Sequence, residues 1–97
     1  KVSRETLFAM ITNNDDVTGV CTSAITDMSG VFLNNTSFNQ DIGNWDTSNV
    51  ITMESMFRGA SDFNHDISNW DVSSASTWDE FRFNSDLSTE NTSVRFR

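Results

Sequence analysis

Hydrophobic and polar positions along this chain recur with a period of about 25 residues, within the range of known repeat proteins. Residues 28–50 align with residues 53–75 without a gap, and ten of the 23 aligned pairs are identical. The identical pairs are Met28/Met53, Phe32/Phe57, Phe38/Phe63, Asn39/Asn64, Asp41/Asp66, Ile42/Ile67, Asn44/Asn69, Trp45/Trp70, Asp46/Asp71 and Ser48/Ser73. Repeats of this length are typical of proteins in which each unit buries its side chains only against its neighbours. The chain is therefore predicted to wind as a solenoid with one coil per repeat.

Each repeat contains a run of apolar residues at helical spacing. In the second repeat, the positions i, i+3, i+4 and i+7 are Met53, Met56, Phe57 and Ala60. These positions form one face of a short helix. Position 59 is Gly, and its equivalents in the neighbouring repeats are Asn34 and Asn84. Gly and Asn readily adopt the left-handed conformation that ends a helix. The pattern predicts three short helices, near 28–33, 53–58 and 78–83.

The pattern Ile-x-Asn-Trp-Asp follows the apolar run in both full repeats, near residues 42–46 and 67–71. We expect these segments to be very short strands that pair from one coil to the next, about 4.8 Å apart. A short helix and a very short strand in each coil make the predicted fold an α/β solenoid.

The two ends of the chain depart from the repeat and are expected to cap it. Ser3 suits the N-cap of a helix and Glu5 suits its first turn. The apolar side of this helix would comprise Leu7, Phe8, Met10 and Ile11. Residues 94–97 alternate between apolar and basic, which predicts an edge strand. The single domain thus divides into an N-terminal helical cap (1–24), two full repeats (25–49 and 50–74), and a partial repeat with a divergent C-terminal cap (75–97).

The net charge of −8 at pH 7 limits the partners of this chain. Nucleic-acid binding requires clustered basic residues, whereas the basic residues here are Lys1 and five scattered arginines. An anionic membrane surface is disfavoured for the same reason, and no apolar stretch is long enough to form a membrane-spanning helix. The acidic character favours solubility, a cation or a basic partner.

The run from Met53 to Ser73 resembles the bacterial surface-protein repeat of about 25 residues. That family occurs in mycoplasma lipoproteins and is related to the BspA-like class of leucine-rich repeats. The resemblance covers roughly residues 16–83 and implies a leucine-rich-repeat-like solenoid in an extracellular or cell-surface setting. The family supplies no catalytic residues to carry over. This chain departs from the family in having only two complete repeats.

The inventory of reactive side chains argues against an enzyme. Cys21 is the only cysteine, so neither an intrachain disulfide nor a cysteine-based zinc site can form. A buried, inert thiol is the favoured interpretation of Cys21 over a reactive or intermolecular one. His65 is the only histidine, and its counterpart Gln40 indicates an exposed position without a catalytic role. Two-carboxylate hydrolysis needs a cleft for which two coils leave little room. No catalytic residue and no cofactor are therefore expected.

Two columns of the repeat have both a structural and a functional interpretation. Trp45 and Trp70 could form a carbohydrate-stacking platform, although a core column is favoured because core positions must repeat in register. The columns Phe32/Phe57 and Phe38/Phe63 are expected in the core for the same reason. The stacked carboxylates of Asp16, Asp41 and Asp66 could bind Ca²⁺. We favour each Asp accepting backbone N–H bonds within its own turn, because neither an EF-hand nor a nonapeptide calcium pattern is present.

The leading prediction is a non-enzymatic surface module that binds a protein or a glycan. Binding would involve positions that vary between repeats, because the fold places no demand on them. Arg58 and His65 are the most distinctive polar residues at such positions, and an exposed edge of Trp45 or Trp70 is the next candidate. The alternative is a purely structural spacer of a surface protein, with or without calcium. An ice-binding face is disfavoured, because the threonines form no ladder longer than Thr22/Thr47.

Overall fold

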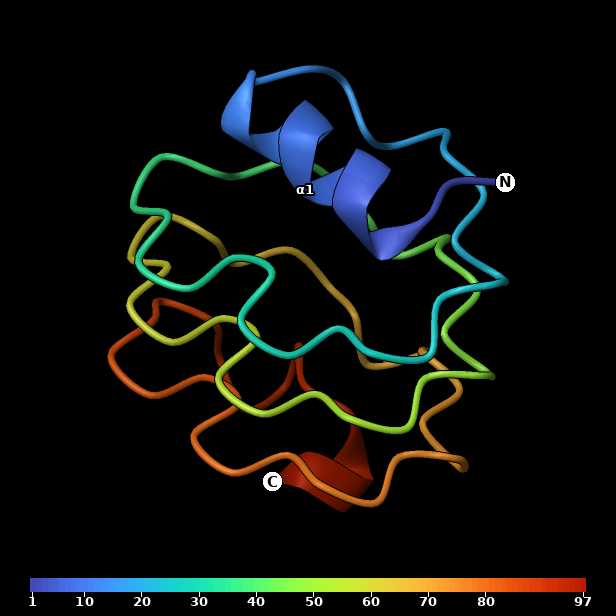
Figure 1. The fold of residues 1–97 in the computed structure, drawn as a ribbon. Helices are drawn as coiled ribbons and strands as arrows, with labels where there is room; N and C mark the ends of the chain where they lie inside the picture. Colours follow the sequence, from blue (N-terminus) through green and yellow to red (C-terminus); the bar gives the residue numbers. More distant parts are fainter.

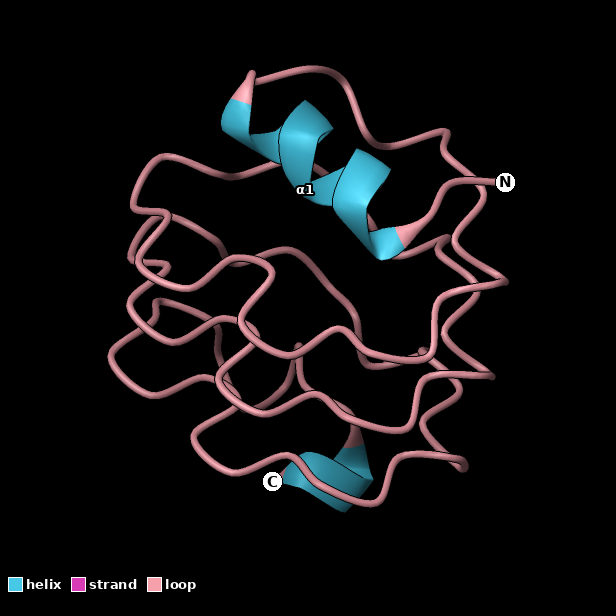
Figure 2. Cartoon of the chain, viewed as in Figure 1, coloured by secondary structure: helices cyan, strands magenta, loops and turns pink.

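The fold is a stack of irregular coils between two short helices. The computed structural model describes all residues, 1–97. The helix α1 (Arg4–Thr12) begins the chain and the 3₁₀ helix η1 (Val94–Phe96) ends it. Between them, the chain winds in successive coils that descend from α1 to the C-terminal end (Figure 1). Figure 2 shows that loops and turns make up all of this region. The β pairing consists of isolated parallel bridges, Asp27 with Thr52 and Thr52 with Thr77.

The predicted α/β solenoid, and with it the leucine-rich-repeat-like architecture, is wrong. None of the segments near 28–33, 53–58 and 78–83 is helical, and none near 42–46 and 67–71 forms a strand. The expected C-terminal edge strand is instead the 3₁₀ helix η1. The N-terminal helix is confirmed, because Ser3 is its N-cap and accepts a hydrogen bond from the backbone N–H of Thr6.

The apolar runs fold as consecutive turns because their N–H groups divide between two acceptors. In the first coil, the N–H groups of Val31, Leu33 and Asn35 donate to the carbonyl oxygens three residues earlier. The alternate N–H groups cross to the next coil instead, from Met28 to Thr52, Gly30 to Glu54, Phe32 to Met56 and Asn34 to Arg58, at 2.7–3.0 Å. We call this second set the coil-to-coil ladder. The second coil repeats it with the third, from Met53 to Thr77, Ser55 to Asp79, Phe57 to Phe81 and Gly59 to Phe83.

Two columns of left-handed residues enforce these turns. Asn34, Gly59 and Asn84 have φ angles of 57°, 72° and 58°, which confirms the left-handed conformation predicted for them. A second column was not predicted and consists of Gly30 (65°), Ser55 (55°) and Glu80 (54°). A residue with positive φ interrupts an α-helix, and a single turn of helix is unstable on its own. Each apolar run is therefore more stable when its N–H groups pair with the adjacent coil than when it forms a helix.

The core consists of side chains that stack from coil to coil. The rings of Phe32 and Phe57 lie 5.1 Å apart and nearly parallel, at 9°. Phe38 and Phe63 follow the same arrangement at 5.7 Å. All four side chains are buried, which confirms both phenylalanine columns as core. Their equal spacing along the sequence brings them into register, because each coil uses one whole repeat to complete its turn.

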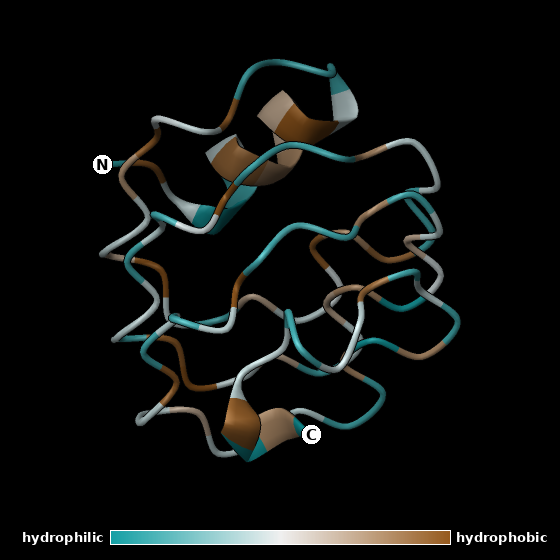
Figure 3. Ribbon diagram, turned by 180° about the vertical axis from the view of Figure 1, so that it is seen from behind, coloured by the Kyte–Doolittle hydropathy of each residue, from teal (hydrophilic) through white to brown (hydrophobic).

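The two helices close the ends of this core. Figure 3 shows apolar ribbon in α1 at one end and in η1 at the other. Leu7 and Ile11 of α1 are buried, whereas Phe8 is 49% exposed. At the other end, Phe96 of η1 stacks on Trp78, with ring centroids 4.9 Å apart. Neither helix combines the length and the apolar character needed to cross a membrane.

Candidate interaction surface

The two repeat tryptophans belong to the core. Trp45 and Trp70 stack with ring centroids 6.3 Å apart and an interplanar angle of 7°, and each is 5% exposed. The indole Nε1–H of Trp45 donates to the carbonyl oxygen of Val17 at 2.9 Å, and that of Trp70 donates to Ile42 at 3.0 Å. The core interpretation is confirmed. Neither ring presents a face on which a sugar could stack.

The stacked aspartates hold turns of their own backbone, as expected. A carboxylate oxygen of Asp16 accepts from the N–H and the hydroxyl of Thr18, at 2.9 and 2.7 Å. Asp66 does the same with Ser68, and Asp41 accepts from the N–H of a glycine two residues on. No three His, Cys, Asp or Glu side chains converge into a group that could hold a metal ion.

A second set of aspartates has the same arrangement and was missed from the sequence. Each carboxylate accepts both the N–H and the hydroxyl of the serine two residues later, in the pairs Asp27/Ser29, Asp46/Ser48 and Asp71/Ser73. The recurring pattern Asp-x-Ser/Thr was the signal that could have revealed them. The serine or threonine hydroxyl is the largest cause that lowers the pKa of five carboxyls: Asp16, Asp27, Asp46, Asp66 and Asp71.

Cys21 is exposed, so the prediction of a buried thiol is wrong. It occupies the column of Asp46 and Asp71, whose turns face solvent. Its Sγ lies 3.3 Å from the hydroxyl oxygen of Ser23, and this hydrogen bond is the largest cause that lowers the pKa of the thiol. Cys21 thus takes the place of an aspartate in a turn of the same kind.

His65 links two coils and is only partly exposed, contrary to the expected solvent-facing position. Its Nε2 lies 2.8 Å from the carbonyl oxygen of Asn39 in the preceding coil. The equivalent Gln40 also reaches back one coil, where it donates to the carbonyl of Asp15 and accepts from the N–H of Val17. Gln and His replace one another here because both side chains carry a nitrogen that can meet a backbone carbonyl. This column therefore helps hold the stack together.

Four of the five arginines bind backbone carbonyl groups at the ends of the stack. The guanidinium of Arg4 donates to the carbonyl oxygens of Asp27 and Ser29, at 3.0 and 2.8 Å. The other three act near the C-terminus, where Arg82 donates to Leu87, Arg95 to Val72 and Ala75, and Arg97 to Thr92 and Glu90. Arg58 is the one arginine whose guanidinium makes no hydrogen bond to a backbone carbonyl.

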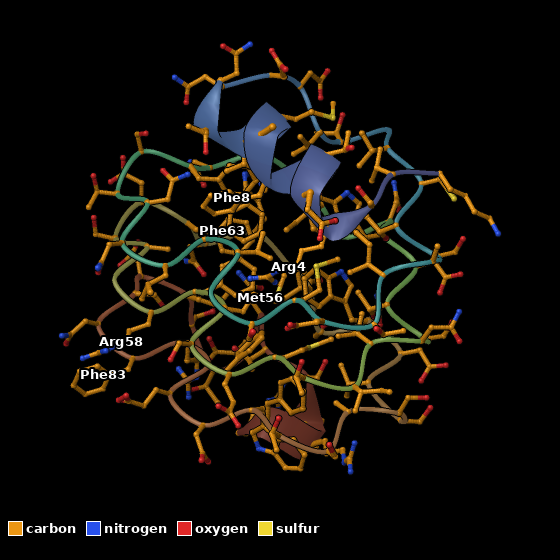
Figure 4. All side chains as sticks on the ribbon, viewed as in Figure 1. Arg4, Phe8, Met56, Arg58, Phe63 and Phe83 are labelled. Atoms are coloured by element: carbon orange, nitrogen blue, oxygen red, sulfur yellow. The ribbon has the colours of Figure 1, made fainter.

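Arg58 lies between two exposed apolar side chains. Leu33, Arg58 and Phe83 occupy one column of three successive coils, and we call them the 33/58/83 stripe. Leu33 is 42% exposed and Phe83 is 50% exposed. The guanidinium carbon of Arg58 lies 5.5 Å from the centre of the Phe83 ring, and its Nε lies 3.8 Å from a carboxylate oxygen of Glu80. Figure 4 shows Arg58 and Phe83 together at one edge of the molecule, pointing outward.

The stripe combines a charged side chain with exposed apolar area. After Leu33 and Phe83 the sequence continues with Asn, Thr, Ser and Asp, which make turns. An arginine between exposed apolar groups offers the hydrogen-bond donors of its guanidinium together with apolar area that a partner can bury. Arginine is also enriched at binding hot spots. Two shallow hollows of about 510 and 570 Å³ lie elsewhere, along residues 1–5 with 24–27 and beside Ile51. The stripe is therefore a flat contact surface and not a cleft.

Comparison with known proteins gives one family. The family described as "Mycoplasma protein of unknown function, DUF285" matches residues 2–95, so the match covers α1, the coils and all of η1 except its last residue. No curated protein and no solved structure shows a match to the chain.

Proposed function

This chain belongs to the DUF285 family of mycoplasma proteins, and we propose that it is a non-enzymatic module that binds a protein through the 33/58/83 stripe. The observation that carries the proposal is the placement of Arg58. It is the only arginine that the fold does not use to satisfy carbonyl groups, and its side chain is 46% exposed.

The apolar members of the stripe favour a protein over a glycan as the ligand. Leu33 and Phe83 expose area that a partner can desolvate around the guanidinium, which is how hot-spot residues contribute to protein interfaces. The tryptophans, which offered the best sugar-stacking surface in the sequence, are buried. The proposed setting is extracellular or on the cell surface, as the resemblance of the repeat to bacterial surface proteins implies.

The experiment is a binding screen of the intact chain against immobilised host matrix proteins and glycans, followed by variants of the stripe. We expect Arg58→Ala and Phe83→Ala each to weaken binding of the captured protein by about thirtyfold, the loss typical of a hot-spot residue. Ile51→Ala is the matched control, because Ile51 is 47% exposed and lies outside the stripe. Thermal melts would show that all three variants remain folded.

Two results would contradict the proposal. A protein ligand bound equally well by the parent and both stripe variants would place the contact elsewhere on the surface. Binding of a glycan alone would change the class of ligand. An intact chain that captures nothing in the screen would favour the alternative function, a structural spacer.

A further inference from the structure

The N-terminal cap is itself a unit of the repeat, although only its second half folds as a coil. The hydroxyl of Thr22 donates to the carbonyl oxygen of Asp46 at 3.0 Å, and Thr47 makes the same bond to Asp71 one coil later. The carbonyl oxygen of Val17 accepts an indole N–H from the next coil, as its neighbour in the same column does. The second half of the cap therefore stacks on the first repeat as one repeat stacks on another.

The first half of this unit is α1, which stands where the later units have their apolar run. Residues 4–12 align with residues 29–37 at the 25-residue period. Leu7 aligns with Phe32 and Phe57, and all three side chains are fully buried. Figure 1 shows α1 lying over the first coil as a further layer of the stack. The helix thus fills the core position that a coil would fill at this height.

Two differences from the next unit explain why this run is helical. Ser3 stands where the next unit has Met28, and its hydroxyl caps the helix by accepting from the N–H of Thr6 at 3.1 Å. Ala9 stands where the next unit has Asn34, which is left-handed. Ala disfavours the left-handed conformation and is the strongest helix former. The cap therefore carries a signal that starts a helix and lacks the residue that would interrupt it.

Arg4 replaces the backbone donors that the helix withdraws from the ladder. A helix directs its N–H groups along its own axis, so α1 cannot donate to the coil below it as a coil would. Each ladder bond runs to the carbonyl 24 positions later, so the carbonyls of Asp27 and Ser29 would pair with the N–H groups of residues 3 and 5. The guanidinium of Arg4 donates to both carbonyls instead, at 3.0 and 2.8 Å. Figure 4 shows the Arg4 side chain directly below α1.

We propose that the N-terminal cap is a repeat unit converted into an end stop for the coil-to-coil ladder. Arg4 occupies carbonyl oxygens that a preceding coil would otherwise bind. The backbone groups of α1 bond within the helix, so its outer side presents no row of donors or acceptors to a further coil. Covering an edge in this way protects it from pairing with other chains. The stop acts on the backbone at one end of the stack, so it does not rest on the function proposed for the 33/58/83 stripe.

The test adds one coil to the intact chain on either side of the stop. A copy of residues 26–50 is inserted after Ile25, beneath the cap, or joined before Lys1, outside the cap. Both placements keep the 25-residue register, so the added sequence is the same and only its position differs. Amide hydrogen exchange then measures whether the inserted copy and the outer copy are folded.

We expect the inserted copy to join the ladder and the outer copy to stay unfolded. The amides that correspond to Met28, Gly30 and Phe32 should exchange about a hundredfold more slowly in the inserted copy than in the outer copy. The inserted copy should also raise the urea midpoint, because each repeat adds an interface with its neighbours. Equal protection of the two copies would show that this end of the stack is open, and would overturn the proposal. An unprotected inserted copy would also overturn it, because the cap would then not be interchangeable with a unit of the repeat.

The variant Arg4→Met tests the guanidinium itself in the chain without an added coil. The N–H of Leu7, which donates to the carbonyl of Ser3 within the cap, should exchange about tenfold faster in this variant. Arg58→Met is the matched control, because it removes a guanidinium that contacts a carboxylate and a ring but no backbone carbonyl. Unchanged protection of Leu7 in the Arg4 variant would show that packing alone holds the cap, and would overturn the role assigned to Arg4.

Discussion

The indole Nε1–H of Trp70 donates a hydrogen bond of 3.0 Å to the carbonyl oxygen of Ile42 in the preceding coil. Trp45 repeats this bond one coil earlier, with the carbonyl of Val17 at 2.9 Å. Both bonds are buried, and each joins groups that are distant in sequence. The tryptophan column therefore joins successive coils through carbonyl oxygens that also accept a backbone N–H within their own coil.

Trp70→Phe should destabilise the protein by about 0.5–1.5 kcal/mol, because it removes one buried hydrogen bond, while the carbonyl of Ile42 still accepts from the N–H of Trp45. Trp78→Phe is the matched control, since Trp78 also stacks on a neighbouring ring but its indole N–H makes no hydrogen bond within the protein. Urea denaturation of both variants measures the difference. Equal losses of stability for the two substitutions would mean that the size of the ring stabilises the fold and the indole hydrogen bond does not.

Phe63→Ala should cost about 3–5 kcal/mol, as the deletion of a fully buried ring does. Phe63 is 0% exposed and stacks on Phe57 with ring centroids 4.5 Å apart. A small domain has little more stability than this to lose, so the variant should be largely unfolded at room temperature. Phe83→Ala, at a half-exposed site, should leave the melting temperature nearly unchanged. A melt of the Phe63 variant within about two degrees of the parent would show that this column is not core.

Ser55→Gly should stabilise the protein by about 0.5–1 kcal/mol. Ser55 has a φ of 55°, a conformation that costs a residue such as Ser about 1–2 kcal/mol, whereas Gly adopts it freely. The greater flexibility of Gly in the unfolded chain offsets part of this gain. Ser61→Gly is the control, because Ser61 is exposed and has no positive φ. If Ser55→Gly destabilised the protein as much as Ser61→Gly does, the positive φ of Ser55 would not be a source of strain.

Acid should destabilise the protein below about pH 4. The turn hydroxyls lower the pKa of five carboxyls in the folded state: Asp16, Asp27, Asp46, Asp66 and Asp71. A carboxyl with a lowered folded pKa stabilises the fold fully above its unfolded pKa of about 3.9. That contribution is lost as pH falls through the folded value. Melting temperatures measured from acid to neutral pH test the effect.

The matched variant for this acid dependence is Ser48→Ala together with Ser73→Ala, which removes two of the hydroxyl donors. Without these donors, the pKa values of Asp46 and Asp71 should return toward their ordinary range. The decline in melting temperature on acidification should therefore become shallower in the variant. An identical decline in parent and variant would assign the acid sensitivity to other groups.

The sequence alone located the features that depend on one residue and its immediate neighbours. The left-handed conformation of Asn34 and Gly59 follows from their residue types, and so does the N-cap at Ser3. The aspartate turns are equally local, because Asp16 bonds to a residue two positions away. The period of the repeat also identified the buried columns, since core positions must repeat in register.

The partners of groups that bond across coils could not be found in this way. Gly30 in the first apolar run was a visible break in the helical pattern, but nothing local shows that its N–H donates to Glu54 in the next coil. The same spacing of apolar residues fits a helix and a series of turns, because both bring positions i, i+3 and i+4 to one side. His65 was placed on the surface because its bond to Asn39 exists only when the coils are stacked.

The candidate surface also combines features that the sequence predicts with contacts that only the folded structure shows. The sequence by itself predicted that Arg58 stands at a position that varies between the two repeats, where it aligns with Leu33. Only the tertiary structure decided which arginines serve the fold, because Arg4 and Arg95 find their carbonyl acceptors in segments distant along the sequence. It likewise decided which backbone N–H groups bond across coils, as that of Phe57 does with Phe81. Backbone donors are the same in every residue but proline, so the side-chain sequence carries no record of which of them bond within a coil and which bond to the next.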